Sequence, residues 1–174
     1  MFDLILSALF FLLPAYVANM CPVFAGAMRL PLGIPIQPSL FGKHKTYRGV
    51  YAAYLGALGA LLLQRWLQEH GVLESFRLLD YRTGNLWLLA ALFGLGAIAG
   101  DLVKSFFKRR LKIAEGRPWI PFDQIDLVLG ALICMSPVYA LDLPRALVLL
   151  LLTPFLHFLT NLTGYTLGLK DVWW

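Results

Sequence analysis

The sequence predicts an all-α membrane protein, a bundle of five transmembrane helices. Two observations carry this prediction. First, 59% of the 174 residues are hydrophobic and only 14% are charged, which is too apolar for an ordinary water-soluble domain. Second, apolar segments close to the roughly 20 residues that cross the hydrocarbon core of a bilayer recur along the chain. None of them alternates between apolar and polar residues, which argues against a β-barrel.

The apolar segments define the expected helices, because a helix satisfies its own backbone hydrogen bonds inside lipid. They cover residues 2–20, 50–67, 86–103, 125–141 and 146–169. Glycines recur in the second and third segments, where small residues let helices pack closely. No internal repeat or linker divides the chain, so we expect a single domain over residues 1–174.

The basic residues gather in alternate loops, and this pattern sets the expected orientation. Residues 22–48 hold four basic residues and no acid, and residues 104–124 hold six basic residues and two acids. Residues 64–85 hold three basic and three acidic residues, which cancel in charge. Short loops rich in lysine and arginine stay in the cytoplasm. We therefore expect a multi-pass protein of the cell membrane with its N-terminus outside and its C-terminus in the cytoplasm, where Trp173 and Trp174 would anchor the chain at the interface.

The net charge of +5 is concentrated in these short loops. Membrane lipids with anionic headgroups, or phosphorylated substrates, are therefore better expected partners than nucleic acid. The sequence leaves a monomer and a homodimer open.

A polar stripe continues the third apolar segment. Its members recur at offsets of 0, 3, 4, 7 and 11 residues, which is one face of a helix: Asp101, Lys104, Ser105, Lys108 and Lys112. One interpretation is a polybasic cuff that binds headgroups, with Asp101 paired to a lysine. The other is a functional site, because an acid at the end of an apolar span is costly.

Two more carboxylates stand at the entry of the fourth segment. Taken alone, Asp123 is expected to cap the helix and Asp126 to be an acid of its first turn, favoured by the helix dipole. Together with Asp101 they place three carboxylates at the inner ends of two neighbouring spans, an oxygen-rich set that suits Mg²⁺. A metal ion beside a row of cations is what phosphoryl or nucleotidyl transfer requires, since its catalysis rests on positioning and charge neutralisation.

Other polar candidates lie outside these two elements. The first loop has cations and a hydroxyl between glycines, which resembles the chemistry of a phosphate-binding loop without being a Walker sequence: Lys45, Thr46 and Arg48. His157 and Asn161 are four residues apart in the last segment. They would serve either as polar contacts between helices or as the lining of a substrate groove, and the same alternatives hold for Asn19.

At these positions the chain resembles a known family of membrane enzymes. Ser105-x-x-Lys108-Arg109, followed by the acids after Pro121, resembles the C-terminal signature of membrane CDP-diacylglycerol synthases. The similarity to their small archaeal relatives, the CDP-archaeol synthases, is closer and extends over the whole chain. It rests on Gly-Asp-x-x-Lys-Ser-x-x-Lys-Arg from Gly100, Pro-x-Asp-Gln-x-Asp from Pro121 and His-Lys-Thr-x-Arg-Gly from His44. The His-Gly-Gly element of the larger family is absent from the sequence.

The resemblance implies an Mg²⁺-dependent cytidylyltransferase of phospholipid biosynthesis. Such an enzyme transfers CMP from CTP to an isoprenoid ether-lipid phosphate, 2,3-bis-O-geranylgeranylglycerol 1-phosphate, and forms CDP-archaeol and pyrophosphate. The expected metal ligands are Asp101, Asp123 and Asp126. The expected catalytic residues are Lys104, Ser105, Lys108 and Arg109. The expected substrate-binding residues are Lys45, Thr46, Arg48, Lys112, Asn19, His157 and Asn161.

Two other classes of membrane protein compete with this hypothesis. A CDP-alcohol phosphotransferase would need acids spaced Asp-x-x-x-Asp, whereas the chain has Asp123-x-x-Asp126. A small transporter or lipid-binding membrane protein without catalytic activity would use the basic loops for topology alone. Transporters often carry internal repeats and polar residues near the membrane midplane. The charged residues of this chain gather at the ends of the spans instead, which favours an enzyme with its active site on the cytoplasmic side.

Overall fold

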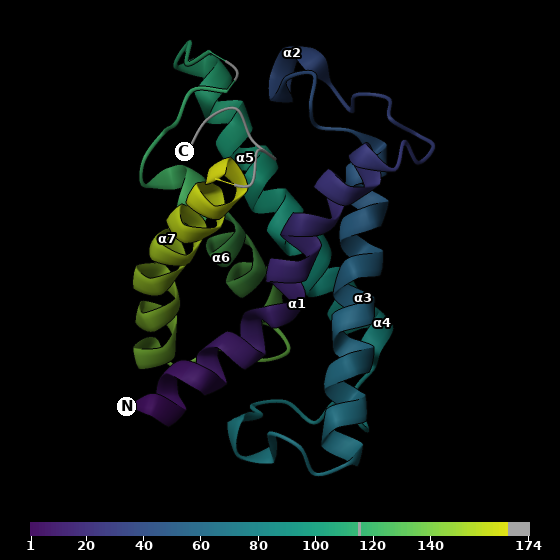
Figure 1. Cartoon of the computed structure of the whole chain (residues 1–174), viewed down its shortest axis with the longest axis vertical. Coiled ribbons are helices and arrows are strands. Elements are labelled where there is room, and N and C mark those ends of the chain that lie inside the picture. Colours follow the sequence, from purple (N-terminus) through teal and green to yellow (C-terminus); the bar gives the residue numbers. More distant parts are fainter. Residues whose placement is uncertain (115, 167–174) are drawn as a thin grey trace.

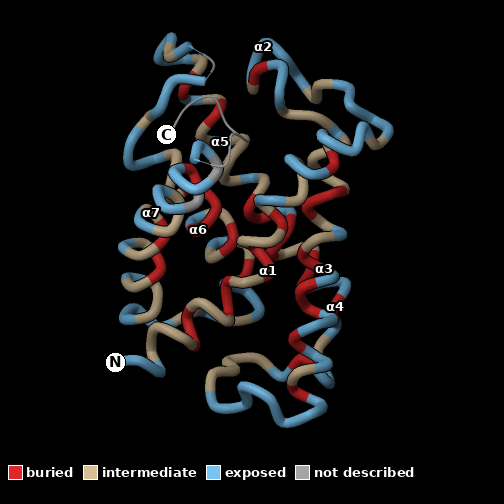
Figure 2. The backbone as a smooth tube through the Cα atoms, in the orientation of Figure 1, coloured by how far each residue is buried: buried red, intermediate tan, exposed pale blue. Residues whose placement is uncertain are grey.

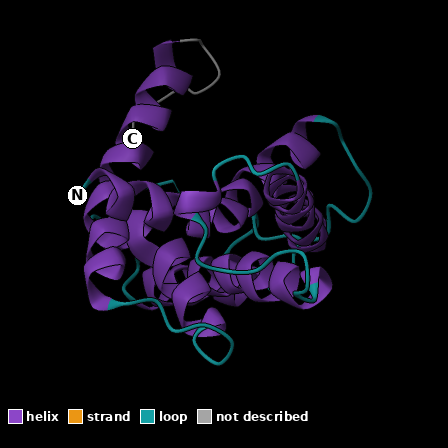
Figure 3. Cartoon of the chain, turned by 90° about the horizontal axis from the view of Figure 1, so that it is seen from below, coloured by secondary structure: helices purple, strands orange, loops and turns teal. Residues whose placement is uncertain are grey.

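The computed structural model describes residues 1–114 and 116–166 (Figure 1). The end of the last expected segment, residues 167–169, and the proposed anchor at Trp173 and Trp174 lie outside the described residues. Within the described part, the chain forms helices and loops, and its β-type pairing is one isolated bridge between Pro35 and Thr46 (Figure 3). The all-α prediction is therefore confirmed.

Among the described residues, four helices are long and apolar enough to cross a membrane. Three of them are continuous α-helices: α1 (Phe2–Ala27), α3 (Tyr47–Glu69) and α7 (Leu143–Thr166). The other is one helix of three consecutive parts: α4 (Leu86–Ala90), a π-helical turn η2 (Ala91–Leu95) and α5 (Gly96–Arg110). Two short helices lie in the loops: α2 (Pro38–Phe41) and the 3₁₀ turn η1 (Glu74–Phe76).

The fourth expected segment is shorter than the sequence indicated. Its helix, α6 (Phe122–Met135), has 14 residues and rises about 21 Å, less than the hydrocarbon thickness of roughly 30 Å. The expected helix over residues 125–141 is wrong at its C-terminal end because Pro137 follows Ser136, and proline has no N–H with which to continue the helix. The Ser136 hydroxyl instead donates a hydrogen bond to the Ile133 carbonyl at 2.8 Å.

Glycines bring pairs of helix backbones into direct contact. A Cβ atom on Gly100 of α5 would lie 2.1 Å from the Asp126 carbonyl oxygen of α6, and one on Gly130 would lie 2.2 Å from the Gly96 carbonyl oxygen. On the other side of the bundle, a Cβ on Gly56 of α3 would lie 2.3 Å from the Cys21 sulfur of α1. This close packing confirms the role expected of Gly56, Gly96 and Gly100, whereas a Cβ on Gly59 of α3 would meet nothing within 4 Å. It also fixes the start of α6 beside the charged end of α5.

Buried residues lie where the helices meet (Figure 2). Large apolar residues elsewhere on the helices remain exposed. Phe11 of α1 packs edge-on against Phe93 of the π-helical turn, with ring centroids 5.2 Å apart, and both are fully buried. By contrast, Leu55 of α3 and Leu151 of α7 are 56% and 77% exposed. Apolar surface of this kind on spanning helices is the surface that lipid covers.

Candidate active site

Three carboxylates converge on one lysine where α5 meets α6. The Lys104 Nζ atom lies 2.9 Å from Asp101 Oδ1, 3.2 Å from Asp123 Oδ1 and 2.7 Å from Asp126 Oδ2. The side chains of the four residues are between 8% and 18% exposed. The structure thus brings together the three acids that the sequence singled out, around an ammonium group.

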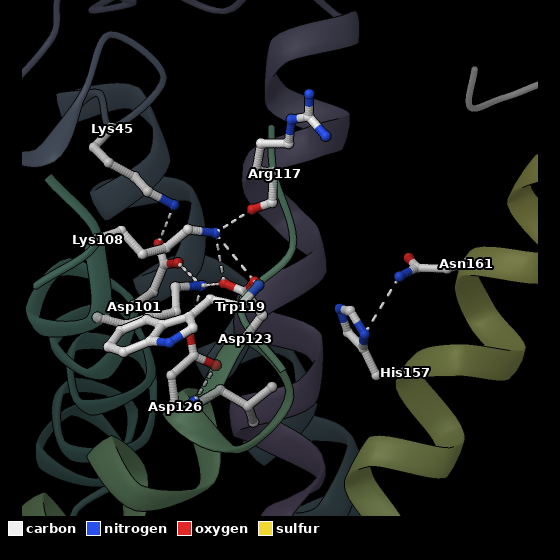
Figure 4. Close-up of polar contacts among 11 residues, drawn as sticks. Lys45, Asp101, Lys108, Arg117, Trp119, Asp123, Asp126, His157 and Asn161 are labelled. Atoms are coloured by element: carbon white, nitrogen blue, oxygen red, sulfur yellow. Dashed lines mark hydrogen bonds and ion pairs between the residues drawn. The ribbon is translucent and has the colours of Figure 1, made fainter. Parts of the chain in front are cut away.

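Two further lysines extend this cluster (Figure 4). Lys45 of the first loop places its Nζ 2.5 Å from Asp101 Oδ2. Lys108 Nζ lies 3.1 Å from both carboxylate oxygens of Asp123 and donates a hydrogen bond to the Arg117 carbonyl at 2.6 Å. Partly buried charges of one sign are costly unless they are paired. We call these three lysines and three aspartates, each paired with opposite charge, the charged network.

The helical spacing of α5 explains half of the charged network. Lys104 is three residues after Asp101 and four before Lys108, so the three side chains share one face of the helix. Ser105 is buried beside them. Lys112 does not continue the stripe, which is a correction to the sequence prediction: α5 ends at Arg110, and Lys112 is exposed with a φ of 58°.

Main-chain groups around the start of α6 donate hydrogen bonds to the aspartates of the charged network. The Trp119 N–H donates to Asp123 Oδ2 at 2.5 Å, and the Leu127 N–H donates to Asp126 Oδ1 at 2.7 Å. The prediction that Asp123 caps α6 is wrong, because the N-cap is Pro121 and Asp123 lies within the first turn. The sequence also did not predict the hydrogen bonds of the Arg117 carbonyl and the Trp119 N–H. Every residue has these main-chain groups, so residue type does not indicate which of them will contact the site.

Three polar cavities surround the charged network. The largest, about 410 Å³, lies between α1, α3 and α5, and its polar lining comprises Asn19, His44, Lys45, Thr46 and Asp101. The polar lining of a second cavity of about 220 Å³ consists of a histidine, a serine and four basic residues: His44, Ser105, Lys45, Lys104, Lys108 and Arg109. The third cavity, about 260 Å³, lies on the side of α7 and is lined by Lys104, Lys108, Arg117, Asp123, Gln124, His157 and Asn161 among others. Most of the predicted substrate-binding residues therefore face a cavity that also touches the charged network.

The polar pair on α7 stands apart from the charged network but faces the same region. The Asn161 Nδ2 and His157 Nδ1 atoms are 3.3 Å apart, and both side chains line the third cavity (Figure 4). Of the two interpretations that the sequence left open, this placement favours the lining of a groove.

Arg48 and Thr46 have different surroundings. Thr46 is the N-cap of α3, where its Oγ1 accepts the Gly49 N–H at 3.2 Å. The Arg48 guanidinium does not line the three polar cavities. Its Nη1 donates to the Leu30 carbonyl at 3.0 Å. Of the first-loop residues that the sequence proposed, Lys45 alone joins the charged network.

An apolar cavity of about 530 Å³ runs between α5 and α6 and ends at the charged network. Its lining is almost entirely apolar, with Val103 and Phe107 of α5 facing Leu129 and Ile133 of α6. At one end it reaches Lys104 and Asp126. A molecule with an apolar chain and an anionic head would therefore have room for its chain next to cations that can bind its head.

The carboxylates match Mg²⁺ in chemistry, but their present positions hold an ammonium. Mg²⁺ binds oxygen ligands at about 2.0–2.1 Å in octahedral geometry. Asp101, Asp123 and Asp126 offer such oxygens around one point, and Lys104 Nζ sits at that point. As they stand, the described residues include no group of three or more acidic, histidine or cysteine side chains that could hold a metal ion. The site fits the ion only if the Lys104 ammonium moves aside.

An apolar helical bundle with a partly buried charged network, and an apolar cavity leading into it, is typical of an enzyme that acts on a lipid within the membrane. The family comparison agrees with this class. A family model described as CarS-like, CDP-archaeol synthase, matches residues 1–174. The chain belongs to the CDP-archaeol synthase family.

Individual relatives support the assignment over nearly full length. The CDP-archaeol synthase of Methanocaldococcus jannaschii is 37% identical over 99% of both chains, and that of Methanothermobacter thermautotrophicus is 38% identical over 98% of this chain and 94% of the relative. A solved structure of an intramembrane enzyme for archaeal membrane lipid biosynthesis is 30% identical, with a TM-score of 0.70 over 89% of this chain and 92% of that one. The family predicted from the sequence is thereby confirmed, and none of these relatives favours a transporter or a non-catalytic lipid-binding protein.

Proposed function

We propose that the chain transfers CMP from CTP to 2,3-bis-O-geranylgeranylglycerol 1-phosphate, forming CDP-archaeol and pyrophosphate. Membership of the CDP-archaeol synthase family supports this reaction. The single structural observation that carries it is the meeting of the apolar cavity with the charged network at Lys104 and Asp126. At that junction, the apolar cavity can hold the chain of a lipid phosphate and Lys104 can bind its phosphate group.

The reaction needs no nucleophile from the protein. An oxygen of the lipid phosphate attacks the α-phosphorus of CTP, and the bond from that phosphorus to the bridging oxygen of the β-phosphate breaks, which releases pyrophosphate. The protein contributes by holding the two phosphates in line and by stabilising the charge that develops on the leaving group. Lys45, Lys104 and Lys108 are suited to this task because their present partners are carboxylates, which incoming phosphates can replace.

The cavities suggest where each part of the substrates binds. The triphosphate would lie in the cation-lined cavity, near the Ser105 hydroxyl and Arg109, and the nucleoside in the largest polar cavity, beside Asn19 and Thr46. An isoprenoid chain would occupy the apolar cavity between α5 and α6. His157 and Asn161 would contact the lipid phosphate or the departing pyrophosphate from the third cavity.

Mg²⁺ is part of the proposal. Asp101, Asp123 and Asp126 would hold the ion once the Lys104 ammonium turns from them to a phosphate, and a bound Mg²⁺ would neutralise charge on the pyrophosphate. Lys104 would then exchange one anionic partner for another, so its charge stays paired. This role for the aspartates agrees with their convergence on a single cation.

The proposal also includes five membrane crossings, with the N-terminus outside and the charged network on the cytoplasmic side. The basic first loop and the basic end of α5 lie at one end of the molecule, and the loop between α3 and α4 lies at the other (Figure 1). Both α5 and α7 run toward the end that carries the charged network, which supports a further crossing between them that includes α6. The cytoplasmic preference of basic loops supports this orientation.

An assay of the purified protein tests the reaction. The protein in detergent or nanodiscs is incubated with labelled CTP, Mg²⁺ and the geranylgeranyl lipid phosphate, and both labelled lipid and pyrophosphate are measured. We expect the two products in equal amounts and neither product when the lipid phosphate is left out. A folded protein that forms no labelled lipid would overturn the proposal.

A further inference from the structure

The first loop is folded as a hairpin that carries Lys45 to the charged network. Main-chain hydrogen bonds join its two arms: the Ile36 N–H donates to the Lys45 carbonyl at 2.8 Å, and the Tyr47 N–H donates to the Ile34 carbonyl at 3.1 Å. A third bond, from the Arg48 N–H to the Leu32 carbonyl, measures 2.8 Å. The position of Lys45 therefore depends on where the first arm of the hairpin is held.

Two side chains of α3 hold the start of that arm. Arg48 Nη1 donates to the Leu30 carbonyl at 3.0 Å, and Tyr51 Oη donates to the Pro31 carbonyl at 3.0 Å. Arg48 and Tyr51 are three residues apart and so lie on one face of α3. They bind consecutive carbonyls, which fixes both the position and the direction of the chain as it leaves α1.

The Arg48 guanidinium also fits tightly against the backbone. A Cβ atom on Gly33 would lie 3.1 Å from Arg48 Nη1 and 3.3 Å from its Cζ, and one on Gly26 would lie 3.7 Å from Nη2. Glycine at position 33 thus leaves the room that the guanidinium occupies. The side chain fills the space between the end of α1 and the hairpin, and it is not among the residues that line the polar cavities of the charged network.

We propose that Arg48, assisted by Tyr51, is a positioning residue: it clamps the hairpin so that the Lys45 ammonium reaches Asp101. Arg48 then acts on the reaction through Lys45, without contact to CTP. This inference rests on the proposed function for its catalytic consequence, but the position of Lys45 can be tested in the protein without substrate.

The test combines kinetics with the reactivity of Lys45 toward an amine-acylating reagent, measured by mass spectrometry on the nucleotide-free protein. In Arg48→Ala we expect Lys45 to react at least about threefold faster, because the hairpin loses its charged anchor, and kcat/KM to fall roughly ten- to hundredfold. Tyr51→Phe removes one exposed hydrogen bond, so its effects should be a few-fold. Arg29→Ala is the matched control, since it removes the same charge from the same loop at an exposed position and should change neither quantity.

Gly33→Ala provides a second variant that leaves every charged group in place. The added methyl group presses on the guanidinium, so Lys45 reactivity should rise in the same direction as in Arg48→Ala, though less. Thermal unfolding and gel filtration of all variants show whether each remains folded.

A different pattern would overturn the clamp. If Arg48→Ala raises the KM for CTP while Lys45 reactivity in the free protein stays at the wild-type value, Arg48 is a nucleotide ligand. Unchanged Lys45 reactivity in both Arg48→Ala and Gly33→Ala would likewise contradict the proposal. If instead the wild-type protein formed no CDP-lipid, the proposed function would fail while the reactivity data still decided the role of Arg48.

Discussion

The two ends of the bundle use similar residues for different purposes. At the end with the charged network, Lys104 forms salt bridges with Asp101, Asp123 and Asp126, and each of these four side chains is less than 20% exposed. At the opposite end, Asp80 is 48% exposed and accepts hydrogen bonds from neutral groups, Thr83 Oγ1 at 2.9 Å and Gln68 Nε2 at 2.7 Å. At the first end, lysines are paired with carboxylates that an incoming phosphate could replace. At the second end, the hydrogen bond from Gln68 to Asp80 holds a loop against α3.

Burial and pairing, more than residue type, distinguish the charged network from the charged residues at the opposite end. Salt bridges at the opposite end, such as Arg65 with Glu69 at 2.9 Å, join side chains that are over 40% exposed. Exposed pairs of this kind contribute little to stability, since water screens them. Substitutions that remove one charge should therefore have large effects at the charged network and small ones elsewhere.

The largest expected effect comes from removing a carboxylate of the charged network. Asp126→Asn and Asp123→Asn should each lower the rate of CDP-archaeol formation by at least about a hundredfold, the size of effect seen when a preorganised charge-stabilising group is removed from an active site. Asp142→Asn, directly before α7 and paired with Arg145 outside the charged network, is the matched control and should keep most of the activity. Radiolabelled CTP incorporation into lipid measures all three.

The contact between α5 and α6 should be the next most sensitive feature. Gly100→Ala places a methyl group where the Asp126 carbonyl oxygen lies 2.1 Å away, so the helices must separate and Asp126 must move from Lys104. We expect a loss of about 1–3 kcal/mol in unfolding free energy and a fall in kcat of roughly tenfold or more. Gly59→Ala is the control, because a Cβ there meets nothing within 4 Å. Equal stability and activity of the two variants would contradict the close packing.

Within the site, the contribution of the apolar cavity to substrate binding can be tested separately from that of the charged network. Leu129 of α6 lines that cavity, so Leu129→Trp should narrow it and raise the KM for the lipid phosphate about tenfold, with the KM for CTP nearly unchanged. Leu151→Trp adds the same bulk to an exposed position on α7 and should change neither constant. A rise in the KM for CTP alone would assign this cavity to the nucleotide.

The smallest effect is expected at the opposite end, as a dependence of stability on pH. Hydrogen bonds from Thr83, Gln68 and the Arg82 N–H hold the pKa of Asp80 below its ordinary value of 3.8. Because the folded-state pKa is lowered, this carboxylate stabilises the fold above pH 4, and the contribution is lost as the pH falls through the folded pKa. Asp80→Asn should remove that dependence and change thermal stability slightly at pH 7, with activity unaffected. An identical acid profile in both proteins would show that these bonds do not matter to stability.

The sequence predicted the local part of the site well. The stripe from Asp101 to Lys108 follows from helical spacing, and the start of the fourth apolar segment places Asp123 and Asp126 near the start of α6. What it did not predict depends on the three-dimensional packing. The pairing of Lys45 with Asp101 joins residues 56 apart, and the bonds to Arg117 and Trp119 come from main-chain atoms.

The sequence-based errors also have local physical causes. The sequence extended α6 to residue 141 because its apolar character continues, whereas Pro137 stops the hydrogen-bond ladder. It extended the polar stripe to Lys112, but α5 ends at Arg110 and the chain turns there through a left-handed residue. Hydrophobicity and periodicity indicate which segments are helical more reliably than where a helix ends.

In the proposed reaction, CTP and the lipid phosphate react at the charged network around Lys104. The most direct measurement compares the rate of CMP transfer to the lipid phosphate in Lys104→Met and Arg110→Met, two variants that lose one positive charge from α5, with both shown to be folded by thermal unfolding and gel filtration. Arg110 is exposed and stacks on Phe106, outside the charged network. We predict at least about a hundredfold loss for Lys104→Met and a rate close to wild type for Arg110→Met. A folded Lys104→Met protein within about threefold of the wild-type rate would contradict the claim.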